Sequence, residues 1–401
     1  MQPSSTPAPK TTRPTDAAIR YADLAMPETG GRTRIGDGVY WIRMPLPFAL
    51  DHINLWLIRD CLNGQEGWTV VDTGVANDAT RAAWHVLAEQ HMDGLPIVRV
   101  ICTHFHPDHI GLAYWLCRGM DRQSIRPPLW INYAEYASAR IWSGSGAKRA
   151  GGSEAITPAA EDDAPDSINM ATHFHRHGVD DADTLEKLRA RRGYYPSMVP
   201  DVPASFHRMF AEDAICIGGH AWRVIAGYGH SPEHCALFCE DLNLLISGDM
   251  VLPKISTNMS VWAQEPDGDP LRLYLESLQA FEPLPDDVLV LPSHGKPFGA
   301  APGTRAGGLK TRLEELRSHH TDRLQETLDA CAQPSRAVDV MRVLFKRTLD
   351  LHQLTFALGE TIAHLNCLWH AGQLERRIDA DGRITFQTRV QGRGRHPTSP
   401  R

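Results

Sequence analysis

The heptapeptide THFHPDH concentrates four imidazole or carboxylate side chains directly after an apolar run. Alternate residues of an extended loop point the same way, so His104 and His106 are expected to converge on one point. Pro107 suits the first position of a helix, where its missing N–H costs no hydrogen bond. That helical turn would direct Asp108 and His109 toward a second point beside the first. The spacing therefore predicts two adjacent metal positions, with donors that suit zinc and also iron or manganese.

Three further ligand-type residues each follow an apolar, strand-like run and stand beside a Gly or Ser: His230, Asp249 and His294. Loops at strand ends hold side chains on a rigid scaffold and keep them open to substrate. We therefore expect these residues to complete the two ligand sets. The predicted metal ligands are His104, His106, Asp108, His109, His230, Asp249 and His294.

The elements that must position these residues begin with strand patterns separated by one helix. Residues 77–91 have helical spacing, with Asn77 or Asp78 as the N-cap. The predicted strands of this first part are 38–44, 52–58, 68–74 and 97–102. Strand patterns resume at 214–217, 221–225, 235–239, 242–247 and 288–292, with a helix at 271–281. This order predicts an α/β fold.

The remaining segments differ in composition. Residues 120–210 are rich in Gly, Ser, Asp, Arg and Pro, which predicts an insertion or cap over the site, with a helix at 182–192. After Gly307 come helical patterns and a hairpin signal at Asp381-Gly382. We predict a catalytic domain at 31–305, a winged-helix-like module at 308–390, and disordered tails at 1–30 and 391–401.

Composition limits the class of protein. The chain has 401 residues, of which 42% are hydrophobic and 22% charged, as expected for a globular protein with a large core. Its 41 basic and 48 acidic residues give a net charge of −7, which argues against a general polyanion binder. No apolar run approaches the roughly 20 residues of a membrane span. The N-terminus has no signal-peptide core and the cysteines form no CxxC pair, so we predict a cytoplasmic location and no membrane partner.

The HxHxDH pattern, followed by isolated His, Asp and His, resembles the metallo-β-lactamase-fold hydrolases over about residues 34–300. Asp72-Thr73-Gly74 is similar to an early strand-end motif of that family. The resemblance implies an αββα sandwich. The C-terminal part resembles the winged-helix-like domain of the glyoxalase II and lactamase-like protein branch. Because His106 stands where iron-redox relatives usually carry Glu, the hydrolytic branch is favoured.

The resemblance also implies how the ligands are shared. His104, His106 and His230 would hold a first metal, and Asp249 would bridge it to a second. The second metal would be held by Asp108, His109 and His294.

A site for two divalent cations, with zinc as the first candidate, indicates a hydrolase. Zinc lowers the pKa of bound water from about 16 to about 7, so a metal-bound hydroxide would attack an acyl carbonyl. Asp108 and Asp249 are the candidates to orient that nucleophile and to shuttle a proton. The favoured substrate is a small ester or thioester, such as an acyl-CoA-like molecule. The C-terminal module would complete the pocket or mediate a homodimer.

Two alternatives remain open at this point. One is a single-strand RNA endonuclease of the same fold, which the net charge and the lack of an aromatic-basic motif rank second. The other is a binding protein without catalysis, against which the full ligand set argues.

Several other residues favour a structural interpretation. We expect Asp72 to be a supporting carboxylate rather than a ligand, and His52 and Asn54 to make structural or weak substrate contacts. Ser231 and His234 either support His230 or cap a turn. The alternating histidines of THFHRHG are predicted to lie in a cap loop: His173, His175 and His177. The aromatic residues of the insertion could line a pocket or pack the cap: Trp142, Tyr194 and Tyr195.

Overall fold

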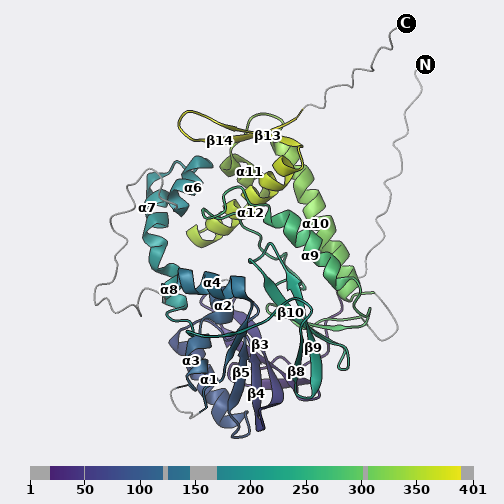
Figure 1. Cartoon of the computed structure of the whole chain (residues 1–401). Helices are drawn as coiled ribbons and strands as arrows, with labels where there is room; N and C mark the ends of the chain where they lie inside the picture. Colours follow the sequence, from purple (N-terminus) through teal and green to yellow (C-terminus); the bar gives the residue numbers. More distant parts are fainter. Residues whose placement is uncertain (1–18, 49, 121–124, 145–168, 301–305, 390–401) are drawn as a thin grey trace, which may run out of the picture.

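Two β-sheets packed face to face form the centre of the computed structural model (Figure 1), which describes residues 19–48, 50–120, 125–144, 169–300 and 306–389. The seven-stranded first sheet runs in the order β1 (Arg32–Gly36), β2 (Val39–Pro45), β3 (His52–Leu62), β4 (Gln65–Val71), β5 (Ile97–Ile101), β6 (Leu129–Ile131) and β7 (His207–Arg208). The five-stranded second sheet runs in the order β12 (Leu289–Pro292), β11 (Leu244–Gly248), β10 (His234–Cys239), β9 (His220–Gly227) and β8 (Ala214–Ile217).

The first sheet has an antiparallel part and a parallel part. β1 to β4 are antiparallel neighbours, whereas β4, β5, β6 and β7 pair in parallel. The central strand β5 is buried along its whole length, which matches its sequence IVRVI. In the second sheet only β11 and β12 pair in parallel.

Helices cover the outer faces of both sheets. On the first sheet lie α1 (Asp78–Gln90), α2 (Pro107–Ile110) and α3 (Ala113–Cys117), which share one apolar core with it. On the second sheet lie α9 (Pro270–Ser277) and η2 (Leu278–Phe281). A third core, which includes Trp41, Trp56 and Trp222, fills the space between the sheets. The four layers confirm the predicted αββα sandwich. As predicted, Asn77 caps α1 by accepting a hydrogen bond from Thr80 N at 2.8 Å.

The expectation that 120–210 is only an insertion is wrong at both ends. Its first part supplies β6 and its last part supplies β7, and both strands extend the first sheet. Between them lie α4 (Tyr133–Trp142), α6 (Met170–Arg176), α7 (Ala182–Ala190), η1 (Arg191–Gly193) and α8 (Tyr194–Met198). The THFHRHG segment is not a cap loop, because Asn169 caps α6, the helix contains His173 and His175, and His177 is its C-cap. His173 and His177 are buried.

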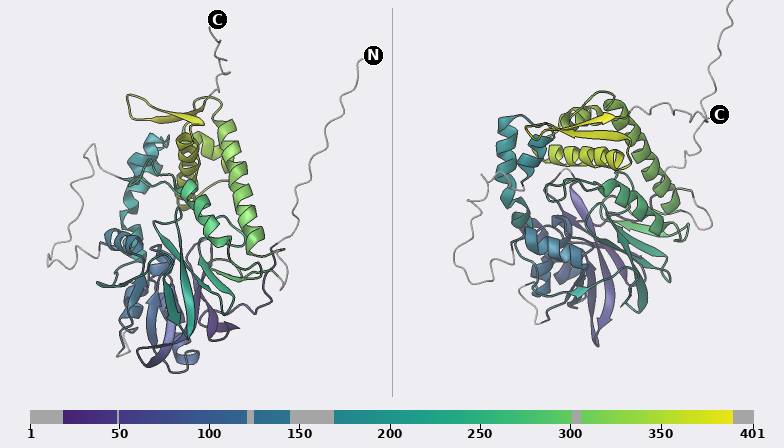
Figure 2. Two further views of the ribbon diagram at one scale, coloured as in Figure 1. Left: turned by 45° about the vertical axis from the view of Figure 1, so that its right-hand side comes forward. Right: turned by 45° about the horizontal axis from the view of Figure 1, so that its top comes forward.

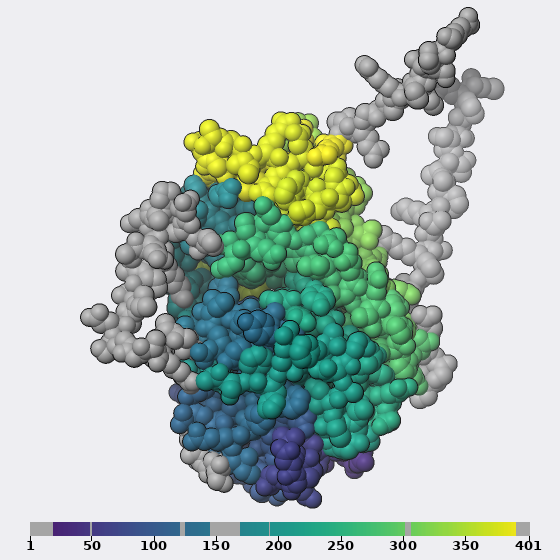
Figure 3. All heavy atoms as spheres, in the orientation of Figure 1, coloured from purple at the N-terminus to yellow at the C-terminus, as the bar shows by residue number. Residues whose placement is uncertain are grey.

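The C-terminal module contains α10 (Leu309–Ala330), α11 (Ala337–Leu344), α12 (Leu351–His370) and a hairpin of β13 (Leu374–Ile378) and β14 (Ile384–Thr388). Figure 2 shows it beyond the end of the sandwich, beside α6 and α7. Arg383 Nη1 donates to the carbonyl oxygen of His175 at 2.7 Å, and Val338 N donates to that of His177 at 3.1 Å. The module is therefore fastened to the insertion. Figure 3 shows a hollow between the blue and green residues, with yellow atoms of this module at its base.

The predicted N-terminal tail is too long. Arg20 N donates to the carbonyl oxygen of Gly307, and Ala22 N to that of Pro297, each at 2.9 Å, so residues 20–22 pack on the fold. Both predicted tails otherwise fall largely in 1–18 and 390–401, outside the described residues. No helix in the described ranges is long and apolar enough to cross a membrane.

Candidate metal centre

The loop between β5 and α2 carries four of the predicted ligands. His106 has extended backbone angles and precedes Pro107, which begins α2 as predicted. Asp108 and His109 lie in the first turn of this helix. The change from extended to helical backbone separates the two pairs of side chains, as the spacing predicts.

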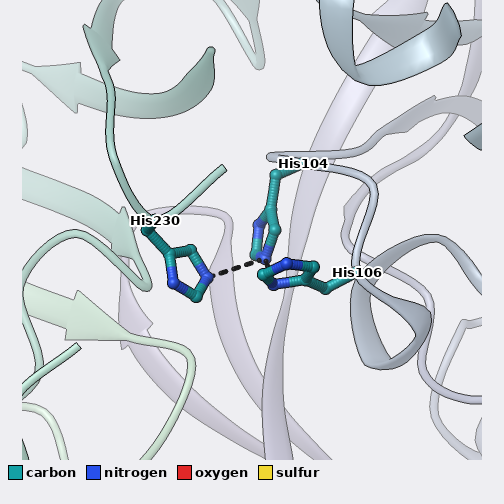
Figure 4. Close-up of side chains that lie close together, drawn as sticks. All are labelled: His104, His106 and His230. Atoms are coloured by element: carbon teal, nitrogen blue, oxygen red, sulfur yellow. Dashed lines mark hydrogen bonds between the residues drawn. The ribbon is translucent and has the colours of Figure 1, made fainter. Parts of the chain in front are cut away.

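Three imidazoles meet at the first point (Figure 4). His104 Nε2 lies 2.9 Å from His106 Nδ1 and 3.2 Å from His230 Nε2. His104 is fully buried, and His230 comes from the loop between β9 and β10. All three nitrogens lie within 4.8 Å of one another, so one ion could contact all of them.

Two carboxylates and two imidazoles meet at the second point. Asp108 Oδ2 lies 3.3 Å from His294 Nε2 and 3.6 Å from His109 Nε2. Asp249 reaches both points, because its Oδ2 lies 3.4 Å from His230 Nε2 and its Oδ1 lies 3.7 Å from His294 Nε2. The structure thus brings all seven predicted ligands together.

The centre has unmet binding capacity that cations would satisfy. His109 Nε2 and Asp249 Oδ1 are buried and have no hydrogen-bond partner, a costly state for polar atoms inside a protein. In each N···N contact among the three imidazoles, one nitrogen must carry a proton and the other must be bare. A cation can instead accept the lone pair of a bare nitrogen from each of the three rings. The ion-pair partners of Asp249 are all histidines in the described part of the chain. The donor set therefore fits two divalent cations.

At four of the ligands the electrostatics favour the protonation state that binds metal. Burial holds the pKa of His104 well below its usual range and lowers that of His106 to about 3, so both imidazoles are neutral. Burial by itself would raise the pKa of Asp108, but His109 and His294 outweigh it and lower the pKa to about 2. The same histidines overcome burial at Asp249 and lower its pKa. Neutral imidazoles and ionised carboxylates are the ligand forms.

His109 behaves in the opposite way. Burial alone would lower its pKa, but Asp108, Asp72 and Asp249 outweigh burial and raise it. Three carboxylates thus hold positive charge on one imidazole. A bound cation would supply the positive charge next to these carboxylates in place of the proton on His109.

Contacts to the far nitrogens orient three of the ligands. His109 Nδ1 donates to Asp72 Oδ2 at 2.8 Å, His230 Nδ1 to the carbonyl oxygen of Asn258 at 2.8 Å, and His294 Nδ1 to that of His52 at 3.1 Å. In the neutral form of each ring the proton lies on Nδ1, which leaves Nε2 bare toward the centre; for His109 this is the form that a bound cation would favour.

The structural roles expected for Asp72, His52 and Asn54 agree with these contacts. Asp72 belongs to none of the three ligand groups found in the described residues. His52 acts through its backbone carbonyl. Asn54 Nδ2 donates to the carbonyl oxygens of Pro292 and Gly295 at 2.8 and 2.7 Å, which fixes the loop of His294.

Two hydrogen bonds hold the backbone of Asp249. Its backbone N–H donates to His234 Nε2 at 3.1 Å, and Thr257 Oγ1 donates to its carbonyl oxygen. Gly248 has φ of 55°, and a Cβ at this position would collide with the His234 ring. The tight turn before Asp249 therefore requires glycine.

Glu135 is a supporting residue that sequence reasoning missed. It lies buried in α4, and its Oε2 accepts from Phe105 N at 2.9 Å. Its Oε1 accepts from Ser231 Oγ at 2.8 Å and from Glu233 N at 2.5 Å. Glu135 thus ties the loop of His104 and His106 to that of His230. Burial raises its pKa to about 7. Nothing in the local spacing marks Glu135, because its partners lie in other segments.

The C-terminal module also supports the centre, which the sequence did not indicate. Arg312 in α10 donates to the carbonyl oxygens of Leu252 at 2.6 Å and Ile255 at 2.9 Å. Glu360 in α12 accepts from Asn258 Nδ2 at 3.5 Å. The segment between Asp249 and Asn258 is therefore held by two helices of this module.

The four-layer sandwich and the shared His/Asp centre at its strand ends define a metallo-β-lactamase-type protein. Residues 49–294 match the family model of the Metallo-beta-lactamase superfamily, and the chain belongs to that superfamily. Residues 324–389 match the model named Metallo-beta-lactamase-like, C-terminal domain.

Individual relatives cover most of the chain. A solved beta-lactamase domain protein from Burkholderia ambifaria is 46% identical, with a TM-score of 0.82 over 92% of this chain and 98% of that one. A metallo-beta-lactamase family protein from Thermus thermophilus is 26% identical, with a TM-score of 0.66 over 88% and 99% of the two chains. The probable metallo-hydrolase YqjP of Bacillus subtilis (strain 168) is 25% identical over 339 residues, which are 83% of this chain and 92% of that protein.

Proposed function

We propose that this protein is a dinuclear metal-dependent hydrolase that cleaves an ester or thioester bond of a small acyl substrate. Water adds to the acyl carbon, the C–O or C–S bond breaks, and a carboxylic acid and an alcohol or thiol are released. The similarity to the probable metallo-hydrolase of Bacillus subtilis supports a hydrolytic role.

The observation that carries the proposal is the position of Asp249. Its two carboxylate oxygens face different ligand groups, with Oδ2 at 3.4 Å from His230 Nε2 and Oδ1 at 3.7 Å from His294 Nε2. The first ion would be held by His104, His106 and His230, the second by Asp108, His109 and His294, with Asp249 between them. Two zinc ions bound here would polarise the carbonyl group and supply a water-derived nucleophile at neutral pH.

The chain's own residues can handle the proton. Asp108 and Asp249 are ionised at neutral pH, because the neighbouring histidines lower the pKa of both carboxyls. The Asp108 side chain is 19% exposed, whereas that of His109 is fully buried. Asp108 is therefore placed to accept a proton from water and to pass it to the leaving oxygen or sulfur. The Asp249 side chain is more enclosed, and its main role would be to fix the relative position of the two ligand groups.

A panel assay on the metal-loaded full chain tests the proposal. The panel contains thioesters, aryl esters, a phosphodiester and single-stranded RNA. We expect thioester or ester hydrolysis that falls at least a hundredfold in Asp108→Ala and is retained in a control, His220→Ala. His220 pairs with the exposed Asp241 at 3.3 Å on the surface. Cleavage of RNA with no ester hydrolysis would overturn the proposal in favour of a nuclease. No turnover of any substrate would favour a binding protein.

A further inference from the structure

A cluster of aromatic rings around one arginine joins three segments that are far apart in sequence. Its members, which we call the Arg191 cluster, are Phe48, Arg191, Tyr194, His352 and Phe356. The Arg191 guanidinium lies over the Tyr194 ring, with 4.4 Å from Cζ to the ring centroid. Phe48 stacks on His352 at 5.3 Å between centroids, and Phe356 meets His352 edge-on at 4.9 Å. The loop before β3, the η1–α8 segment and α12 therefore meet at this cluster.

The cluster lies beside the metal centre. Tyr195, next to Tyr194, donates its hydroxyl to the carbonyl oxygen of Phe105 at 2.6 Å, and Phe105 separates the ligands His104 and His106. Phe48 is four residues before His52, whose carbonyl oxygen holds His294. Burial raises the pKa of Tyr194, and Arg191 and Asp108 are both close enough to influence that pKa. The Tyr195 contact thus joins the cluster to the loop of His104 and His106, and Phe48 precedes the residue that holds His294.

The charge of the cluster is unbalanced. His352 Nδ1 faces two donors, Arg191 Nη2 at 3.2 Å and the Tyr194 hydroxyl at 3.3 Å, so this imidazole accepts and is neutral. Arg191 Nη1 donates to Thr355 Oγ1 at 3.5 Å. In the part of the chain that the structure describes, no carboxylate pairs with Arg191. A guanidinium has five N–H donors, and the contacts with His352, Thr355 and the Tyr194 hydroxyl use at most three of them.

Arg191 differs in its exposure and its partners from Arg189, the nearby arginine with which it can be compared. Arg189, two residues earlier, is 54% exposed and pairs with Glu186 at 3.2 Å. Arg191 is only partly exposed, lies on an aromatic face and contacts neutral groups. A partly desolvated guanidinium that lies over an aromatic ring binds an anion more strongly than a fully hydrated one.

We infer that the Arg191 cluster is the substrate subsite for an anionic group, a carboxylate or phosphate that lies away from the bond to be cleaved. This inference rests on the proposed ester or thioester hydrolysis and specifies its substrate class. The rings would cover the apolar part of the substrate on either side of the anion. The subsite is built jointly by the insertion and the C-terminal module, so their docking would set specificity.

Matched thioesters test the inference. The S-butyryl thioesters of mercaptopropionate and mercaptopropylphosphonate carry an anion on the thiol side, and that of propanethiol is neutral. The propyl thioesters of adipate and hexanoate make the same comparison on the acyl side. We expect at least one anionic substrate to exceed its neutral partner in kcat/KM by roughly tenfold or more, as a charge-assisted hydrogen bond allows.

The Arg191→Met variant should abolish that preference, because kcat/KM for the anionic thioesters falls to the level of their neutral partners, while Arg191→Lys should retain part of it. Arg189→Met, the matched control on the same segment, should behave like the wild type. A wild type without anion preference would overturn the inference. So would an Arg191→Met variant in which neutral and anionic substrates decline equally, because that result indicates a structural role.

A binding measurement separates this inference from the proposed function. Calorimetry on the full chain needs no turnover, and it compares N-butyryl-β-alanine with the neutral N-butyrylpropylamine and the monopropylamide of adipate with the neutral N-propylhexanamide. Tighter binding of the anionic amide, lost in Arg191→Met, would support the subsite even if no thioester were hydrolysed. Equal binding of the anionic and the neutral amide in both pairs would contradict the subsite even if hydrolysis occurred.

Discussion

Replacing Asp72 by Asn should impair one metal position and spare the other. Asp72 Oδ1 accepts from Thr103 N at 2.8 Å, and Oδ2 accepts from His109 Nδ1 at 2.8 Å. In Asp72→Asn the amide oxygen is needed by Thr103, so the amide NH₂ group must face His109. That donor requires a bare Nδ1 and moves the ring proton to Nε2, the atom that faces the metal.

The expected magnitude follows from this contact. A hydrogen bond to a charged group contributes about 1.5–3 kcal/mol, which corresponds to roughly 10- to 100-fold in affinity. Loss of a contact that orients a metal ligand typically has an effect of about the same size. Backbone strain should not confuse the result, because Asp72 has φ of 64° and Asn tolerates that region well.

Calorimetric titration of the metal-free protein would resolve the two ions. We expect the weaker dissociation constant, assigned to the Asp108–His109–His294 group, to rise roughly 10- to 100-fold in Asp72→Asn, with the tighter one unchanged. The control is Asp60→Asn, because Asp60 is a buried carboxylate that pairs with Arg99 at 3.1 Å in a different place. Wild-type affinity for both ions in Asp72→Asn, or equal weakening of both, would refute the reasoning.

Three further predictions concern the supports of the centre. Gly248→Ala should lower the free energy of unfolding by about 1–3 kcal/mol and weaken metal binding, because its Cβ would strike the His234 ring. Gly64→Ala, which also has positive φ but open space around its Cβ, should keep wild-type metal affinity in the same titration. Burial raises the pKa of Glu360 to about 7, above its unfolded value, so Glu360 alone should lower the stability of the wild type by at most about 2 kcal/mol between about pH 5.5 and about pH 8.5. Urea unfolding should find that the loss is smaller by this amount in Glu360→Gln, in which Glu135, whose pKa burial also raises to about 7, still contributes; a loss identical to that of the wild type would contradict the assignment to Glu360. Chelation should lower Tm, since bound ions at about a thousand times their dissociation constant stabilise a fold by about 4 kcal/mol; a Tm insensitive to chelator and to added zinc would contradict this.

The ligands could be predicted from the sequence because their geometry is set locally. His104, His106, Asp108 and His109 lie within six residues, and Pro107 fixes where extended backbone becomes helical. The other three ligands follow buried strands, whose apolar runs are visible in the sequence. The long strands and the helices of the C-terminal module were predicted for the same reason, since their periodicity extends over many residues.

The supports of the centre could not be predicted because they depend on packing between distant segments. Glu135 accepts from Phe105 N and Glu233 N, which are 30 and 98 residues away. Arg312 reaches back 60 residues to Leu252. The strands β6 and β7 contain three and two residues, too few for any period to appear. Histidines alternate with other residues in THFHRHG, a pattern that favours extended backbone. The cap at Asn169 and the burial against the C-terminal module nevertheless make the segment helical up to Arg176.

The most direct test of the account is the metal content and its location. Elemental analysis of the purified chain, combined with anomalous diffraction from crystals grown in zinc, should find two ions. One should lie among His104, His106 and His230, the other among Asp108, His109 and His294, with Asp249 contacting both. His294→Ala should lose the second ion and keep the first. A chain that holds no transition metal after zinc loading, or holds it away from these side chains, would contradict the central claim.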